Sequence, residues 1–456
     1  VELGYIAPDH AWATDAWHTQ AYQVFGLLAW LSVALALGAA IVPHGSQFGS
    51  LAAIALTASL PLLVAGRWES GWAVASACRW AFALYTACWT LLLTAPRQLM
   101  QTLRRWLPAA RGYSAGLTDL TRDTAFAVGT LPLLGLTLLA TAQLACGTAW
   151  NGPLTDTWFA RITPAVSYAV PVAVLAVTAL MHAAREGRAV YALFGAVMCE
   201  CALALAVVLD QAVPRAGWTV AQSVTLVQTL TAGLAGYGLI WLALSRWIER
   251  DAARLRRPLL KVQIAGTGLA AAGLAAWAVA CLFVDVHDAA PALEYLGRWP
   301  SYLAVGLAVA AVAWFTHRDA RYLAGLAVGA PVVLAPIVAA SICPATVARP
   351  CDGYQLLISI WLGIGLSAAV AVCWQRLLGQ DQPWLAVVRR ASAALGLAVF
   401  VLNLGAEWPA TWWTIGVYGG LAALWTVLGI GCRSQWCACA SVVSLLCGAW
   451  LLWEHV

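Results

Sequence analysis

The chain has 456 residues, of which 62% are hydrophobic and only 10% are charged. Soluble globular proteins carry about 25% charged residues and about 45–50% apolar ones. A soluble chain of this length would need two or three domains, and so few charged side chains cannot cover their surfaces. The composition therefore excludes a soluble enzyme, a nucleic-acid-binding protein and a disordered chain, and it predicts an all-α polytopic membrane protein.

The apolar residues form long continuous runs. A helix that crosses a hydrocarbon core about 30 Å thick needs about 20 apolar residues, and the in–out alternation of a β-barrel does not occur in these runs. Residues 1–18 are predicted as an outer N-terminal segment, and residues 19–456 as a single transmembrane bundle. Its fourteen predicted spans are 19–42, 50–66, 70–95, 124–146, 163–183, 189–210, 218–245, 259–283, 299–316, 321–342, 355–376, 389–405, 409–430 and 434–453.

The basic residues of the loops divide unequally between the two sides of the membrane. One set of alternate loops holds nineteen Arg and Lys residues, in the segments 97–122, 182–188, 246–261, 317–321, 376–390 and 431–435. The other set contains only Arg67, Arg161, Arg215, Arg298 and Arg349. Loops rich in Lys and Arg stay in the cytoplasm, so both termini are predicted to lie outside. The predicted location is a bacterial inner membrane.

Two ionisable side chains fall deep inside predicted spans, where they are costly to place and therefore indicate function. Arg79 lies in the third span, about eight residues from its outer end, and Glu200 lies near the middle of the sixth. At about 1.5 Å per residue, both fall about 12–15 Å below the outer surface. They form a candidate functional pair. Two structural interpretations stay open: a static packing pair, and separate roles in which Arg79 extends to the outer interface while Glu200 is protonated.

Two basic segments are predicted to lie on the cytoplasmic membrane surface. In segment 97–122, Leu99, Leu103 and Trp106 share one helical face and the arginines lie mostly off it, as in an interfacial amphipathic helix. Segment 246–261 is more highly charged. Both are expected to bind anionic lipid head groups, with the docking of a cytoplasmic partner as the alternative.

One outer loop, CPATVARPC, is bracketed by Cys343 and Cys351. Such a loop faces an oxidising compartment, so a disulfide is predicted, with two free thiols as the alternative. No catalytic residue, metal site or cofactor is predicted. Cys199 and Cys201 lack the further ligands that a metal needs, and the sequence contains no P-loop motif.

The cytoplasmic loops alternate between short turns and long basic segments, so a unit of four helices recurs. Segments 172–196 and 304–328 match in the order and kind of their residues. An even number of helices keeps successive units in one orientation. This predicts parallel repeats at about 19–160, 161–298, 299–408 and 409–456. The alternative is the general self-similarity of Ala- and Leu-rich helices.

Small residues cluster in the seventh and eighth spans. They are Gly233, Gly236, Gly238, Gly266, Gly268 and Gly273. Such residues predict close helix packing, with a flexing gate as the alternative.

Three classes of function agree with these features. The leading one is a transporter or flippase-like translocator of a lipidic or weakly polar substrate, with Glu200 and Arg79 in its path. The second is a non-catalytic scaffold or anchor subunit of a larger complex, and the third is a membrane enzyme acting on lipid or glycan. The expected partners are membrane lipids and, for a scaffold, other membrane subunits; nucleic acid is not expected.

Overall fold

The computed structural model describes residues 71–90, 126–138, 164–212, 219–248, 258–283, 286–342, 351–405, 412–432 and 434–455, except for positions 89, 128 and 381. All regular secondary structure in these ranges is helical. The chain divides into two compact units, the first formed by residues 1–217 and 244–259 and the second by residues 218–243 and 260–456.

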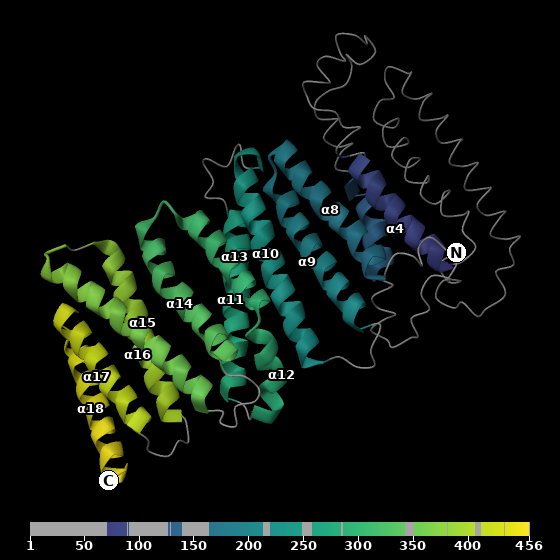
Figure 1. Cartoon of the computed structure of the whole chain (residues 1–456). Coiled ribbons are helices and arrows are strands. Elements are labelled where there is room, and N and C mark those ends of the chain that lie inside the picture. The colour runs from purple at the N-terminus through teal and green to yellow at the C-terminus, as the bar shows by residue number, and fades with distance from the viewer. Residues whose placement is uncertain are drawn as a thin grey trace, which may run out of the picture. The chain divides into compact units, whose positions relative to one another are not determined.

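Three long helices of the first unit are described, and the second unit contains most of α10 and all later helices (Figure 1). The first-unit helices are α4 (Gly71–Ala87), α8 (Pro164–Glu186) and α9 (Ala189–Ala212). The others are α10 (Val220–Ile248), α11 (Pro258–Phe283), α12 (Val286–Leu296), α13 (Trp299–Thr316), α14 (Ala320–Ile342), α15 (Cys351–Leu377), α16 (Pro383–Gly405), α17 (Trp412–Cys432) and α18 (Gln435–His455).

Ten of the described helices are long and apolar enough to cross a membrane. They coincide with the last ten predicted spans, and most ends agree within a few residues; α16 begins earlier than predicted, at Pro383. The first four predicted spans lie wholly or partly outside the described residues. Within those spans the structure gives α4 and a shorter apolar helix at Gly129–Leu138.

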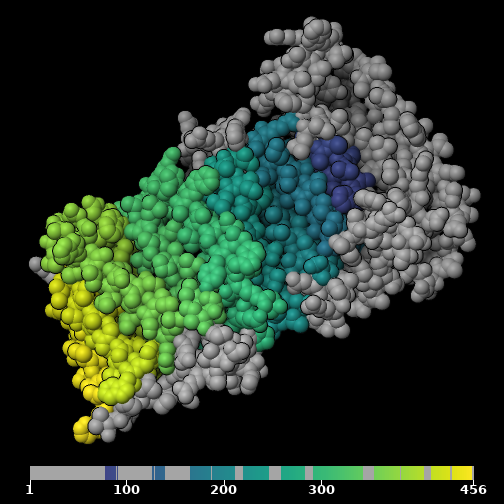
Figure 2. Space-filling view, viewed as in Figure 1, coloured from purple at the N-terminus to yellow at the C-terminus, as the bar shows by residue number. Residues whose placement is uncertain are grey.

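The second unit has one large apolar core shared by its helices. Figure 2 shows side chains filling the spaces that separate the ribbons of its green and yellow helices in Figure 1. Fully or almost fully buried members of this core include Leu274, Ala278, Val305, Ile337, Leu357, Val399, Leu421 and Leu428. Because these residues come from α11 and α13–α17, one core positions all of these helices.

The segment predicted as an outer loop at 285–298 contains the helix α12, which periodicity did not indicate. Gly297 lies between α12 and α13. A side chain does not fit at this position, because a Cβ there would lie 2.6 Å from the Cα atom of Ser341. Gln228 of α10 donates hydrogen bonds to the Tyr295 carbonyl (2.8 Å) and to Ser301 Oγ (2.7 Å). These contacts hold the corner between α12 and α13 against α10 and α14.

Short polar turns join the long helices. Gly187, after α8, has a φ of 73° and its N–H donates to the Ala183 carbonyl, as glycine commonly does at a helix C-terminus. At α14, Asp319 Oδ1 accepts a hydrogen bond from the Arg321 N–H at 2.9 Å and caps the helix start. The two segments of the proposed repeat, 172–196 and 304–328, both form helical hairpins around these turns. The repeat itself stays a prediction.

The outer faces of the helices are apolar. On α18, Trp436 and Trp453 are 86% and 82% exposed, and several leucines of this helix are exposed beside them. In water such faces would be unfavourable by about 25 cal/mol per Å², whereas a helix that is apolar all round is typical of a membrane span. The chain is an integral membrane protein with many transmembrane helices.

Candidate functional site

Arg79 is completely buried between α4 and α8. Its Nη2 atom donates to Ser167 Oγ at 3.3 Å, and its Cζ atom lies 3.3 Å from the centre of the Tyr168 ring. Both partners are themselves buried. The guanidinium is therefore held inside the protein by a hydroxyl and an aromatic face of α8.

Glu200 lies near the middle of α9 and is half-buried. Met198 and Ala202 belong to the core shared with α8. At about 100° per residue, Glu200 points away from the face that these two residues form. Its Oε1 atom is buried and accepts no hydrogen bond from the described residues. A carboxyl group near the middle of a membrane-spanning helix stays a functional candidate for that reason.

The structure does not bring the two predicted residues into contact. Among the described residues, Arg79 and Glu200 form no ion pair, and Arg79 contacts Ser167 and Tyr168 of α8. Their joint function remains a prediction. The bond between Cys343 and Cys351 also remains a prediction, since Cys343 and the side chain of Cys351 lie outside the described residues. Segment 97–122 and most of 246–261 lie outside them as well.

The sequence places His182 at the end of a span, and the structure shows that this histidine is buried. His182 belongs to α8 and is completely buried. Its ring stacks on Phe126 at 5.8 Å and meets Tyr191 edge-on at 4.5 Å. These contacts fasten the end of α8 to α9.

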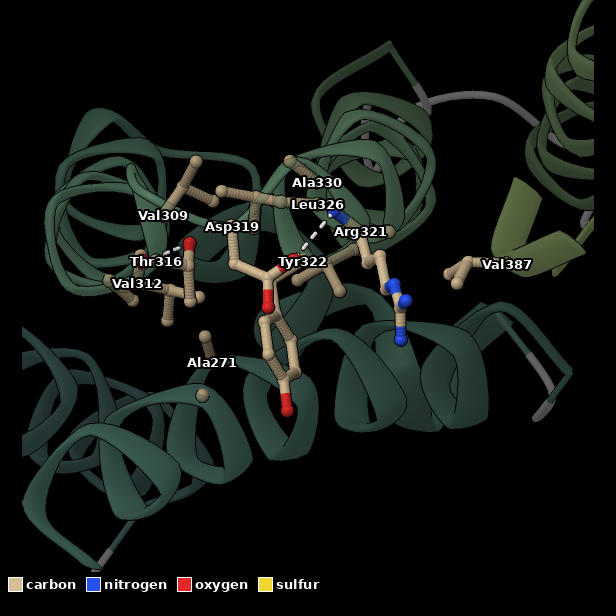
Figure 3. A pocket seen from close by; sticks show the side chains of 15 residues that line it. Ala271, Val309, Val312, Thr316, Asp319, Arg321, Tyr322, Leu326, Ala330 and Val387 are labelled. Carbon is tan, nitrogen blue, oxygen red and sulfur yellow. Dashed lines mark hydrogen bonds between the residues drawn. The ribbon is translucent and has the colours of Figure 1, made fainter. Parts of the chain in front are cut away.

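A feature of the second unit that the sequence did not predict is a groove beside α14, called here the α14 groove (Figure 3). It encloses about 580 Å³, within the range of about 300–1,000 Å³ typical of small-ligand sites. Its lining residues are Gly268, Ala271, Ala308, Val309, Val312, Thr316, Asp319, Arg321, Tyr322, Gly325, Leu326, Gly329, Ala330, Val333 and Val387. They come from α11, α13, α14 and α16.

Polarity changes along the α14 groove. Thr316, Asp319, Arg321 and Tyr322 gather where α13 turns into α14, and all other lining residues are apolar. Figure 3 shows the side chains of Arg321 and Tyr322 extending from this turn, with Val309 and Val312 on the facing wall. The groove therefore has a polar mouth and an apolar interior.

Glycine leaves space inside the α14 groove. A Cβ added at Gly268 or Gly329 would meet no atom within 4 Å, while one at Gly325 would touch Val387 Cγ1 at 3.4 Å. The predicted close packing is found at Gly238 and Gly266, whose Cβ atoms would lie 3.6 Å from Ile264 Cδ1 and 3.8 Å from Leu234 Cδ2, but not at Gly236, Gly268 or Gly273, where a Cβ would meet no atom within 4 Å. Gly325 and Gly329 form a G-x-x-x-G pattern, which commonly indicates helix contact. Here one of the two glycines borders empty space.

A second groove lies on another face of α14, between it, α15 and α16. It encloses about 630 Å³. Ser367 and Trp384 are its lining residues with a polar group, and the others are apolar. Pro331 of α14 borders this groove. Because proline has no N–H, Pro331 cannot donate to the Ala327 carbonyl one turn earlier, and Ala327 borders the same groove.

No family model matches the chain, and no curated protein or solved structure matches it either.

Proposed function

We propose that the protein is a translocator of a lipidic substrate, and that the α14 groove is part of the path. The observation that carries this proposal is the change in polarity along the groove. A lipid has a polar head and an apolar tail, and the groove offers a polar mouth and an apolar interior in the same order.

Length supports the proposal as well. From Arg321 to Val333, both lining residues, α14 rises about 18 Å at about 1.5 Å per residue. One leaflet of the hydrocarbon core is about 15 Å thick, half of about 30 Å. A lipid tail can thus lie along α14 with its head group at the mouth.

Two prolines allow α14 to bend. Pro331 and Pro336 lie within this helix, and each removes one helical hydrogen bond. Kinks in membrane helices occur at such positions. Bending there would extend the groove beyond one leaflet, which a translocator requires and a static scaffold does not.

The proposal is tested by reconstituting the whole chain into vesicles that contain a fluorescent phospholipid in both leaflets. An impermeant reductant then bleaches the label that reaches the outer leaflet. The Gly329→Leu variant fills the groove without a backbone clash. Overfilling an apolar site costs about 1–3 kcal/mol, so translocation should slow by about 5- to 150-fold.

Gly306→Leu is the matched control. Gly306 lies in α13, a Cβ there would meet no atom within 4 Å, and the residue does not line the α14 groove. Its translocation rate should equal that of the wild type. Vesicles with wild-type protein that bleach no further than empty vesicles would overturn the proposed function and favour a scaffold.

A further inference from the structure

The mouth of the α14 groove contains an arginine, Arg321, whose charge is not balanced by an ion pair with any described residue. Of the described lining residues, only Asp319 and Arg321 are charged. The Asp319 carboxylate is engaged at the start of α14, where it accepts the Arg321 backbone N–H and faces the positive end of the helix dipole. The guanidinium of Arg321 is exposed and forms no ion pair with a described residue.

The other polar groups at the mouth are also suited to an anion. Tyr322 is 65% exposed, so its phenol is available as a hydrogen-bond donor. Figure 3 shows the guanidinium of Arg321 directed away from Asp319, on the side of Val387, rather than folded back onto the carboxylate. An oxyanion at this position would meet a guanidinium that binds phosphate through two parallel hydrogen bonds.

The occupant must join this anion to an apolar chain. Beyond the mouth, the groove is lined only by Gly, Ala, Val and Leu among the described residues, and burying a charge or an unpaired polar group there would be unfavourable. We infer that the α14 groove binds an anionic glycerophospholipid, with its phosphate on Arg321 and one acyl chain along α14. This inference names the substrate class of the proposed function and rests on it only for movement, since binding is measured without translocation.

The experiment measures equilibrium lipid binding to the purified whole chain in detergent by native mass spectrometry. The probes are dioleoyl phosphatidylglycerol, dioleoyl phosphatidylcholine, dioleoylglycerol and inorganic phosphate. Wild-type protein should bind phosphatidylglycerol about tenfold more tightly than phosphatidylcholine, because the choline cation of the latter is repelled by the guanidinium that binds its phosphate. Dioleoylglycerol, which has no phosphate, should bind more weakly still. Arg321→Gln should remove this preference by lowering phosphatidylglycerol affinity about tenfold, the order of effect of one lost charge-assisted hydrogen bond.

Two further variants separate the head group from the chain. Gly329→Leu should weaken the binding of both phospholipids, because the leucine side chain fills the space of the acyl chain. Arg318→Gln, in the same turn but outside the groove lining, should change neither affinity.

Three outcomes would overturn the inference. They are equal binding of dioleoylglycerol and phosphatidylglycerol, an unchanged preference in Arg321→Gln, and displacement of phosphatidylglycerol by inorganic phosphate at equal concentration, which would identify a phosphate site. Selective binding without translocation would instead overturn the proposed function and leave this lipid site in place.

Discussion

A guanidinium inside a membrane protein needs partners of its own, and Arg79 obtains them from α8. Placing an arginine at the centre of a membrane helix costs about 2.5–3.5 kcal/mol on insertion scales. A desolvated cation–π contact such as that with Tyr168 contributes about 2 kcal/mol, and the hydrogen bond to Ser167 adds to it. These contacts offset most of that cost.

Arg79 and Glu200 should therefore behave independently in a thermodynamic test. We expect Arg79→Gln to destabilise the protein by about 2–4 kcal/mol, through lost contacts and buried polar groups left unpaired. Glu200→Gln keeps the side-chain volume and should change stability little. Changes in the free energy of unfolding add within about 0.5 kcal/mol for residues that share no contact. The loss of stability of the double variant should therefore equal the sum of the losses of the two single variants.

Melting in detergent measures all three variants, and a coupling energy well above 1 kcal/mol would establish the static pair instead. The translocation assay then tests Glu200 separately. If Glu200 acts in transport, Glu200→Gln should reduce translocation or its dependence on pH while leaving melting unchanged. Unchanged translocation at every pH would remove this residue from the path.

At the residue scale, the sequence could select Arg79 and Glu200 because burying a charge is costly wherever it occurs. It could not predict Ser167 and Tyr168 as partners of Arg79. They are neutral, they lie in a different helix, and their contact depends on how α4 packs against α8. Arg321 was missed for the opposite reason, since an arginine in a short turn resembles any solvated loop residue.

At the element scale, α14 shows how one helix accommodates two prolines. Pro336 cannot donate to the Val332 carbonyl, which is its partner one turn earlier in a regular helix. Trp361 of α15 supplies the missing donor, with Nε1 at 3.1 Å from that carbonyl oxygen. Proline is tolerated in membrane helices when neighbours satisfy the freed carbonyl in this way.

Pro336 and Trp361 should consequently be coupled in their effects on stability. Trp361→Phe removes the donor and leaves a buried carbonyl unpaired, which should cost about 1–3 kcal/mol beyond the loss of ring volume. In a Pro336→Ala background the alanine N–H can restore the helical bond, so the extra cost should disappear. Thermal melting of the singles and the double measures this difference.

Trp425→Phe is a suitable control, because Trp425 is buried in the same core and loses the same ring volume. Its cost should not depend on residue 336. Equal costs of Trp361→Phe in both backgrounds would mean that the indole N–H does not compensate for the proline.

The long helices of the described ranges were predictable because length and hydropathy alone define a membrane span. The helix α12 was not, since Val286–Leu296 is short, carries charged residues and contains Pro291. The α14 groove could not be predicted either. It combines short pieces of α11, α13, α14 and α16, and in each piece the small residues resemble ordinary packing positions.

At the scale of the whole molecule, the direction of every helix depends on which side of the membrane each loop occupies. The charge asymmetry of the loops predicts that Arg298 lies outside and that the turn containing Arg318 lies in the cytoplasm. Arg298 directly precedes α13 (Trp299–Thr316) and Arg318 follows it by two residues, so one helix separates them. The same prediction places the mouth of the α14 groove in the cytoplasmic leaflet.

Single cysteines at these two positions test the topology. Arg298→Cys should react with an impermeant maleimide in intact cells, because the Arg298 side chain is 48% exposed. Its loss also removes an ion pair with Glu294, whose hydrogen bond raises the pKa of Arg298, but such an exposed pair contributes little to stability.

Arg318→Cys should react only after the membrane is permeabilised. The background is the chain with Cys343 and Cys351 replaced by serine, because these two residues lie in the predicted outer loop and would react there if they are free thiols. Label reaching both positions from one side would show that α13 does not cross the membrane. Label reaching them in the reverse order would invert the topology and place the groove mouth, with Arg321, in the outer leaflet.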